Sequence, residues 1–318
     1  KALAPKGAAT PVSERPLDLS QILQTPPSER VRLGEKDMEA LQQFAEALRT
    51  PIEVLEAVQG ALGLRPRQRH FAGAVHAVEA VFAADLSLTR LRPGTYLRRR
   101  AVPPWAHEVP EALRPVHGPL SLGETDEALV PIPELPAELA DEVLNPAYED
   151  IGETEVTVVE EPLTEISLTI PWHHWRCGTL MLRQRDRSFF HLPASLTLPT
   201  LQTPDDRRLP VWANSQTSLL YGLLTWYDEV LPPSGAIVTL RRTDAPAVLV
   251  LEYNEEMDHA ARIGADRMAQ LLALRDRLQR RPTSLAETVA AVLQGQAKGL
   301  AFDPLWFQLN IVRRTTRH

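Results

Sequence analysis

The sequence lacks several features that would assign it to a class of protein at once. Cys177 is the single cysteine, which excludes a disulfide framework and a cysteine-rich zinc site and is typical of a reducing compartment. The sequence contains no run of 18 apolar residues, so we expect no membrane-spanning helix. It also contains no HExxH, P-loop, GxGxxG or GxSxG motif. We therefore expect a cytoplasmic protein, nucleoid-associated if prokaryotic, with no catalytic activity, metal or cofactor.

Basic residues are missing from a long central stretch. Between Pro115 and Trp175 there is no Lys or Arg but there are 14 acidic residues, whereas the rest of the chain has 34 basic and 27 acidic residues. The net charge of −7 hides this uneven distribution of charge. The asymmetry indicates a polyanionic partner, or association of the acidic stretch with the basic parts of the chain. A solvated acidic linker is the alternative interpretation.

Composition and periodicity predict an α+β protein made of five parts. A flexible arm is followed by a helical unit that ends in a hairpin, then by an acidic, proline-rich linker, a β region, and a long helix with a second helical unit. These parts cover residues 1–35, 36–102, 103–153, 154–254 and 255–318.

The first helical unit has clear local patterns. Thr50-Pro51-Ile52-Glu53 predicts a helix start, because a Thr N-cap is followed by Pro at the first helical position and by Glu. A helix over 68–84 should bury one face, which carries Phe71, Val75, Val78 and Phe82. A hairpin then follows around Arg92-Pro93-Gly94. Helices followed by a strand, a turn and a strand are the layout of a winged helix-turn-helix.

The β region predicts seven short strands, which is typical of a small barrel or sandwich. The expected strands cover 156–159, 166–170, 179–182, 195–198, 209–213, 237–240 and 248–252. Beyond them we expect a helix over 255–281 and a capping box, formed by Ser284 and Glu287, at the next helix start. His173 and His174 would point to opposite faces of a strand, so we interpret them as structural residues rather than metal ligands.

Two parts of the helical pattern resemble a known module. Residues 50–102 resemble the HARE-type winged helix-turn-helix, which occurs in the delta subunit of bacterial RNA polymerase and in chromatin and restriction proteins. The matching features are Thr50-Pro51-Ile52-Glu53-Val54-Leu55, the helix around Phe71 to Phe82, and the hairpin Arg92-Pro93-Gly94-Thr95-Tyr96-Leu97-Arg98. Residues 283–318 resemble the first two-thirds of this module. The resemblance implies binding to DNA or to DNA-bound machinery.

The β region has a resemblance of its own. Residues 164–252 resemble a DNA-binding pseudobarrel of the plant transcription-factor type, which also occurs in a restriction endonuclease. The matching segments are Leu168-Thr169-Ile170-Pro171, Phe189-Phe190, 222–227, 231–235 and 237–242. The resemblance implies that loops at one end of the barrel grip the major groove of DNA. Ala236 stands where the pattern expects Asp.

Arginine clusters are the candidate nucleic-acid contacts, because the guanidinium fork fits phosphate and guanine edges. The first cluster lies at the start of the expected recognition helix and on the hairpin, and contains Arg65, Arg67, Arg69, His70, Arg90, Arg92 and Arg98. The second contains Arg176, Arg183, Arg185 and Arg187, and the last three alternate, so on a strand they would share one face. The third ends the second helical unit, and contains Arg313, Arg314 and Arg317. A solvated arginine surface is the alternative interpretation.

Three hypotheses follow from these patterns. The main hypothesis is a modular, non-catalytic protein that binds duplex DNA through the arginine clusters. The alternative is a protein-interaction scaffold within a larger complex that does not contact nucleic acid. A third is the targeting part of a restriction or modification enzyme. Arg69, Arg92 and Arg98 on one open face would favour DNA binding, whereas their pairing with carboxylates would favour a scaffold.

The acidic stretch leads to a first prediction. If it occupies the basic surfaces until DNA displaces it, deletion of residues 120–153 should raise the affinity for non-specific duplex DNA and change its salt dependence. Fluorescence anisotropy over a range of salt concentrations measures both quantities. Unchanged affinity and an unchanged salt slope would contradict this role of the acidic stretch.

Overall fold

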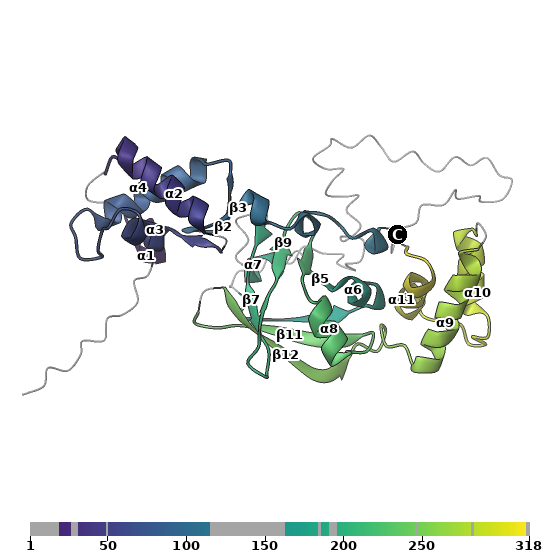
Figure 1. Cartoon of the computed structure of the whole chain (residues 1–318). Helices are drawn as coiled ribbons and strands as arrows, with labels where there is room; N and C mark the ends of the chain where they lie inside the picture. The colour runs from purple at the N-terminus through teal and green to yellow at the C-terminus, as the bar shows by residue number, and fades with distance from the viewer. Residues whose placement is uncertain are drawn as a thin grey trace, which may run out of the picture. The chain divides into compact units, whose positions relative to one another are not determined.

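The structure, a computed structural model, describes residues 19–26, 31–48, 50–114, 163–183, 186–190, 196–245, 247–280 and 283–315. The described residues form an α+β protein that divides into two units, Lys1–Ala101 and Val102–His318 (Figure 1). Most of the predicted acidic linker and the expected strand at 156–159 lie outside the described ranges. Among the described helices, none is long and apolar enough to cross a membrane.

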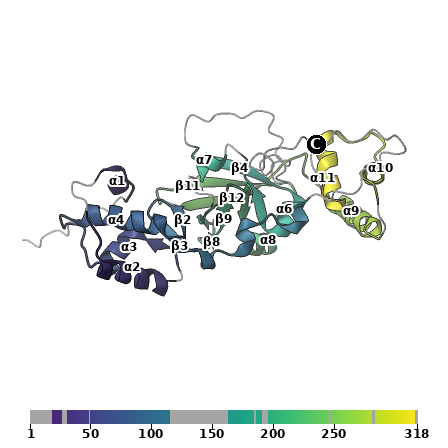
Figure 2. The same cartoon turned by 90° about the horizontal axis from the view of Figure 1, so that it is seen from above.

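The first unit combines helices with a small sheet (Figures 1 and 2). The sheet has three strands in the order β1-β3-β2. Its elements are α1 (Leu19–Gln24), α2 (Glu35–Ala47), β1 (Ile52–Glu53), α3 (Val54–Gly60), α4 (Phe71–Ala84), β2 (Leu88–Arg92), β3 (Thr95–Arg98) and the 3₁₀ helix η1 (Arg99–Ala101). The helix predicted over 68–84 is confirmed as α4, and its four large apolar residues are buried. The predicted hairpin is also confirmed, with Gly94 in the left-handed conformation that its turn requires (φ +74°).

The predicted helix start at Thr50-Pro51-Ile52-Glu53 is wrong. Ile52 and Glu53 form strand β1 instead, opposite Tyr96 and Thr95 of β3, and helix α3 begins only at Val54. The pairing is reinforced by side chains, because the Glu53 carboxylate accepts hydrogen bonds from Arg92 Nη2 (2.7 Å) and Thr95 Oγ1 (2.9 Å). A tertiary contact with the hairpin therefore overrides the local capping pattern.

The second unit is built around two sheets. One has the order β4-β11-β12-β7-β8 and the other β5-β10-β9-β6, and every pairing is antiparallel except that of β12 with β7. The strands are β4 (Glu165–Ile170), β5 (Thr179–Met181), β6 (Leu196–Thr197), β7 (Thr200–Gln202), β8 (Arg208–Pro210), β9 (Trp212–Asn214), β10 (Leu219–Tyr221), β11 (Ala236–Arg242) and β12 (Val248–Met257). Helices α6 (Trp172–Cys177), α7 (Asp186–Phe189) and α8 (Leu224–Val230) lie between them in sequence.

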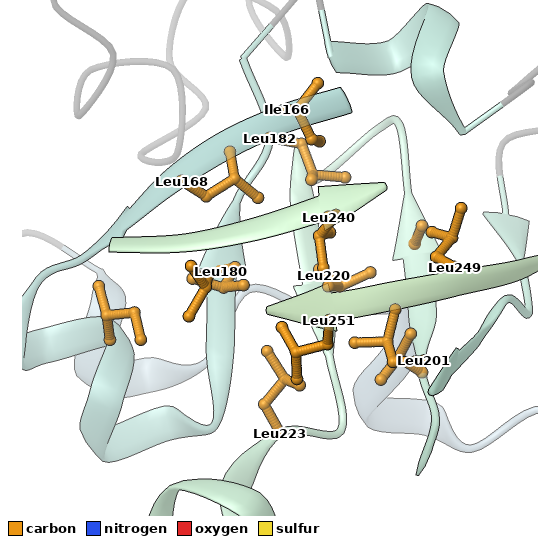
Figure 3. Packing of buried hydrophobic residues seen from close by; sticks show 14 of the residues in the cluster. Ile166, Leu168, Leu180, Leu182, Leu201, Leu220, Leu223, Leu240, Leu249 and Leu251 are labelled. Atoms are coloured by element: carbon orange, nitrogen blue, oxygen red, sulfur yellow. The ribbon is translucent and has the colours of Figure 1, made fainter. Parts of the chain in front are cut away.

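The prediction of a seven-stranded barrel is wrong in the number of strands and in closure, because the described strands form two separate sheets of four and five strands. The hydrophobic core contains side chains from both sheets. Leu180 and Leu220 of the four-stranded sheet gather with Leu240 and Leu251 of the five-stranded sheet, and all four are fully buried (Figure 3). Burial of this shared apolar surface holds the two sheets together.

Two further boundaries differ from the sequence prediction. The strand expected over 209–213 is two strands, β8 and β9, which belong to different sheets. Val211 lies between them, and its N–H donates to Pro199 O (2.9 Å). The helix expected from 255 begins at Ala265, because β12 continues to Met257 opposite Ala236 of β11.

The C-terminal part is a group of three helices, α9 (Ala265–Leu278), α10 (Leu285–Leu293) and α11 (Phe302–Val312). The predicted capping box is confirmed, since Ser284 Oγ accepts from Glu287 N and Glu287 Oε2 accepts from Ser284 N (2.9 Å). The Arg267 side chain of α9 connects the helices by donating to Gln308 Oε1 of α11 (2.8 Å) and Val292 O of α10 (2.5 Å).

The segment after Val102 was predicted to be linker, but its first part is folded onto the second unit. It forms two short 3₁₀ helices, η2 (Pro104–His107) and η3 (Glu111–Leu113). The buried Asn214 side chain donates to Ala106 O (2.8 Å), and the Tyr221 hydroxyl donates to Glu108 O (3.0 Å). Burial raises the pKa of Tyr221 to about 12, which extends to higher pH the range over which its hydroxyl stays protonated and able to donate.

Candidate nucleic-acid interface

The loop before α4 presents a cationic cluster to solvent. Arg65, Arg67, Arg69 and His70 are all exposed, and the segment ends at His70, the N-cap of α4. Gln68 organises the turn, because its Oε1 accepts from Arg65 N (2.8 Å) and its carbonyl accepts from Phe71 N (3.0 Å). The first turn of α4 contains no acidic residue, so the positive end of the helix dipole adds to the charge of the arginines.

The arginines of the hairpin have a different setting. Arg90 Nη2 lies 2.7 Å from Glu79 Oε1, Arg92 Nη2 lies 2.7 Å from Glu53 Oε1, and Arg98 Nη2 lies 4.0 Å from Glu46 Oε1. The three arginines are thus in ion pairs within the first unit. A phosphate that approached them would meet the neighbouring carboxylates as well, so its net attraction would be small.

The second predicted cluster is not a stripe on a strand. Strand β5 ends at Met181, and Arg183 turns back to donate to the buried Asp186 carboxylate through Nε (2.8 Å) and Nη2 (3.0 Å). Arg176 lies on helix α6, where its guanidinium stands 5.0 Å from the ring centre of Trp172. Arg187 lies in α7, and Arg185 lies outside the described residues.

The third predicted cluster is used inside the second unit. Arg314 is only 6% exposed, and it donates to Leu113 O (2.7 Å), to Asn310 Oδ1 (2.7 Å) and to Thr315 O (2.7 Å). Arg313 donates to Thr283 O (2.6 Å), which ties the end of α11 to the segment before α10. Arg317 lies outside the described residues.

The two histidines expected on a strand lie on helix α6 instead, and both are buried. His174 Nδ1 is 3.0 Å from Thr179 Oγ1, and the His173 ring meets Trp306 edge-on at 5.7 Å. Burial raises the pKa of the Cys177 thiol, which keeps it protonated and weakly nucleophilic. The described residues contain no group of three His, Cys, Asp or Glu side chains that could hold a metal ion.

One side-chain contact beside the candidate interface was not predicted from the sequence. His76 lies in the middle of α4, and its Nε2 is within 2.9 Å of Ile22 O and 3.0 Å of Thr25 O. No pattern in the sequence links His76 to a segment some 50 residues earlier, because the contact depends on how α1 packs. A lone histidine in an alanine-rich helix gives no other sign of such a contact.

Comparison of the chain with protein-family models, curated protein sequences and solved structures found no match.

The buried position of Arg314 leads to a stability prediction. Substitution Arg314→Ala should lower the free energy of unfolding of the second unit by about 3 kcal/mol, because buried acceptors lose a charged donor. Urea denaturation followed by tryptophan fluorescence measures this, since all six tryptophans lie in the second unit. The control is Arg277→Ala on the exposed side of α9, which should change stability by less than about 0.5 kcal/mol. Equal effects of the two substitutions would contradict the structural role of Arg314.

Proposed function

We propose that the first unit is a winged helix-turn-helix and that the protein binds duplex DNA, without catalysis, through the loop that precedes α4. The element order α2, β1, α3, α4, β2, β3 and the sheet order β1-β3-β2 support the fold assignment. In helix-turn-helix domains, the N-terminal residues of the recognition helix contact the DNA. Here the recognition helix is α4, and its N-terminal residues follow directly after the cationic loop, residues 65–70.

The observation that carries the proposal is the exposure of Arg65, Arg67, Arg69 and His70 together at the N-terminus of a 14-residue helix. Exposed guanidinium groups neutralise phosphates and release condensed counterions, which supplies most of the affinity of non-specific DNA binding. Backbone N–H groups at a helix N-terminus favour the same anionic groups. The loop therefore combines two independent sources of attraction for the DNA backbone.

We infer that binding has low sequence specificity. Ala72, Ala80 and Ala83 occupy exposed positions of α4, and alanine offers no hydrogen bond to a base edge. The resemblance of residues 164–252 to a DNA-binding pseudobarrel stays a prediction. DNA binding through the loop before α4 does not require this resemblance, since the loop lies in the first unit. In the second unit, Arg183, Arg313 and Arg314 are bonded internally.

A protein-interaction scaffold is the second candidate, and the hairpin favours it. Arg92 and Arg98 are paired with Glu53 and Glu46, whereas only Arg69 of the three diagnostic arginines lies exposed in the cationic loop. A scaffold would retain its partner but show no salt-dependent affinity for duplex DNA.

The decisive substitution removes the charge of the loop. The triple variant R65Q/R67Q/R69Q should bind a random duplex more weakly, and its salt slope should fall by roughly 3, about one for each phosphate that the loop no longer neutralises. Anisotropy titrations at several salt concentrations give both numbers.

A charge-matched control separates local contact from net charge. R262Q/R277Q/R280Q makes the same change in charge at exposed arginines of the second unit, and it should leave the slope unchanged. Equal losses in both triple variants would reject the loop as the binding site, and absence of duplex binding by the unmodified chain would reject DNA binding altogether.

A further inference from the structure

Helix α1 covers part of the surface that a winged helix would present to DNA. Leu19, Ile22 and Leu23 pack against the apolar core of the first unit, and Figure 2 shows α1 alongside α4. At its C-terminal end, the carbonyls of Ile22 and Thr25 lie 2.9 and 3.0 Å from His76 Nε2. Segment 19–26 is therefore attached to α4 by both apolar and polar contacts.

The same segment also touches the turn of the hairpin. A Cβ atom placed on Gly94 would clash with Leu19 Cδ2, so the leucine side chain lies directly against the glycine backbone. Gly94 is the turn residue between β2 and β3, the hairpin that would be the wing. Segment 19–26 thus contacts both DNA-facing elements of the proposed winged helix, the recognition helix and the wing.

His76 lies on the side of α4 that faces away from the core. Successive helix residues are separated by about 100°, which places His76 roughly opposite the direction shared by Phe71, Val78 and Phe82. This outward side of a recognition helix is the one that enters the major groove. His76 is half-buried there, because α1 lies over it.

The hydrogen-bond acceptors that His76 contacts in segment 19–26 are of the same kind as those that DNA offers. Carbonyl oxygens only accept hydrogen bonds, so His76 Nε2 must carry the hydrogen and donate it toward Ile22 O and Thr25 O. Guanine N7 and O6 and the phosphate oxygens are acceptors of the same kind. The sequence of α1 is Leu-Ser-Gln-Ile-Leu-Gln, which carries no charge, so its removal uncovers the surface without altering the local charge.

We propose that segment 19–26 is an internal cover of the α4 and hairpin surface, and that duplex DNA displaces it and takes over the hydrogen bond of His76. This inference depends on the proposed DNA binding and adds to it a regulated step and a contact residue. Because the competent state must first open, the apparent affinity is reduced by the fraction of molecules that are open.

The test loosens the cover in the full chain. The variant I22N/L23N removes apolar contacts of α1. The segment counts as loosened when the amides of 19–26 exchange hydrogen at the rate of an unfolded chain, and L19N is added if the double variant does not reach that rate. Retained exchange protection in α3 and α4 shows that the first unit is still folded. The matched control is Leu86→Asn, the same type of substitution at a leucine of this unit that is 80% exposed.

The loosened variant should bind a random duplex about tenfold more tightly if the cover is open in about one molecule in ten. Its salt slope should equal that of the unmodified chain, because the uncovered surface adds no charge. Leu86→Asn should leave the affinity unchanged. Adding His76→Ala to the loosened variant should remove part of the gain, because the uncovered donor is then absent.

Each outcome assigns the failure to one proposal. If neither the unmodified chain nor the loosened variant binds duplex DNA, the proposed function is wrong, and so is the proposed role of segment 19–26. If the unmodified chain binds DNA and the loosened variant binds equally or more weakly, the cover alone is wrong. If the loosened variant with His76→Ala retains the full gain in DNA affinity, segment 19–26 is a cover but His76 is not a contact residue.

Discussion

A guanidinium group that leaves water needs hydrogen-bond acceptors for its donors, and this requirement organises much of the described structure. Arg314 is bonded between the 3₁₀ segment at Leu113 and helix α11, and Arg267 connects the three C-terminal helices. Arg242 donates from β11 to Phe189 O. In each case the arginine joins segments that are distant in sequence, so these side chains act as connectors of the fold.

The same requirement limits how much of the candidate interface a sequence can reveal. The positions of arginines along the chain predicted three clusters, but a guanidinium that binds an internal carbonyl looks identical in sequence to one that faces solvent. Arg183 and Arg314 are bonded internally, whereas Arg65, Arg67 and Arg69 are exposed. What separates them is the exposure of the side chain, which depends on how distant segments pack and which no local pattern encodes.

Local patterns predicted the parts of the fold that depend on local physics. The apolar spacing of α4 and the capping box at Ser284 are properties of a few neighbouring residues, and both are confirmed. The errors arise where distant pairing decides. Ile52 and Glu53 extend because β3 pairs with them, and the chain over 209–213 changes sheets because β7 and β10 bind its two halves. His173 and His174 fall in a helical turn that ends at Gly178 in the left-handed conformation.

The loop before α4, with Arg65, Arg67 and Arg69 exposed, is the proposed DNA contact, whereas Arg183, Arg313 and Arg314 bind acceptors within the second unit. Hydrogen-exchange mass spectrometry of the full chain, with and without saturating duplex DNA, tests this assignment most directly. The account predicts new protection over residues 64–76 and none around Arg183 or over 310–315. Protection confined to the second unit, or protection spread evenly over all three arginine clusters, would contradict it.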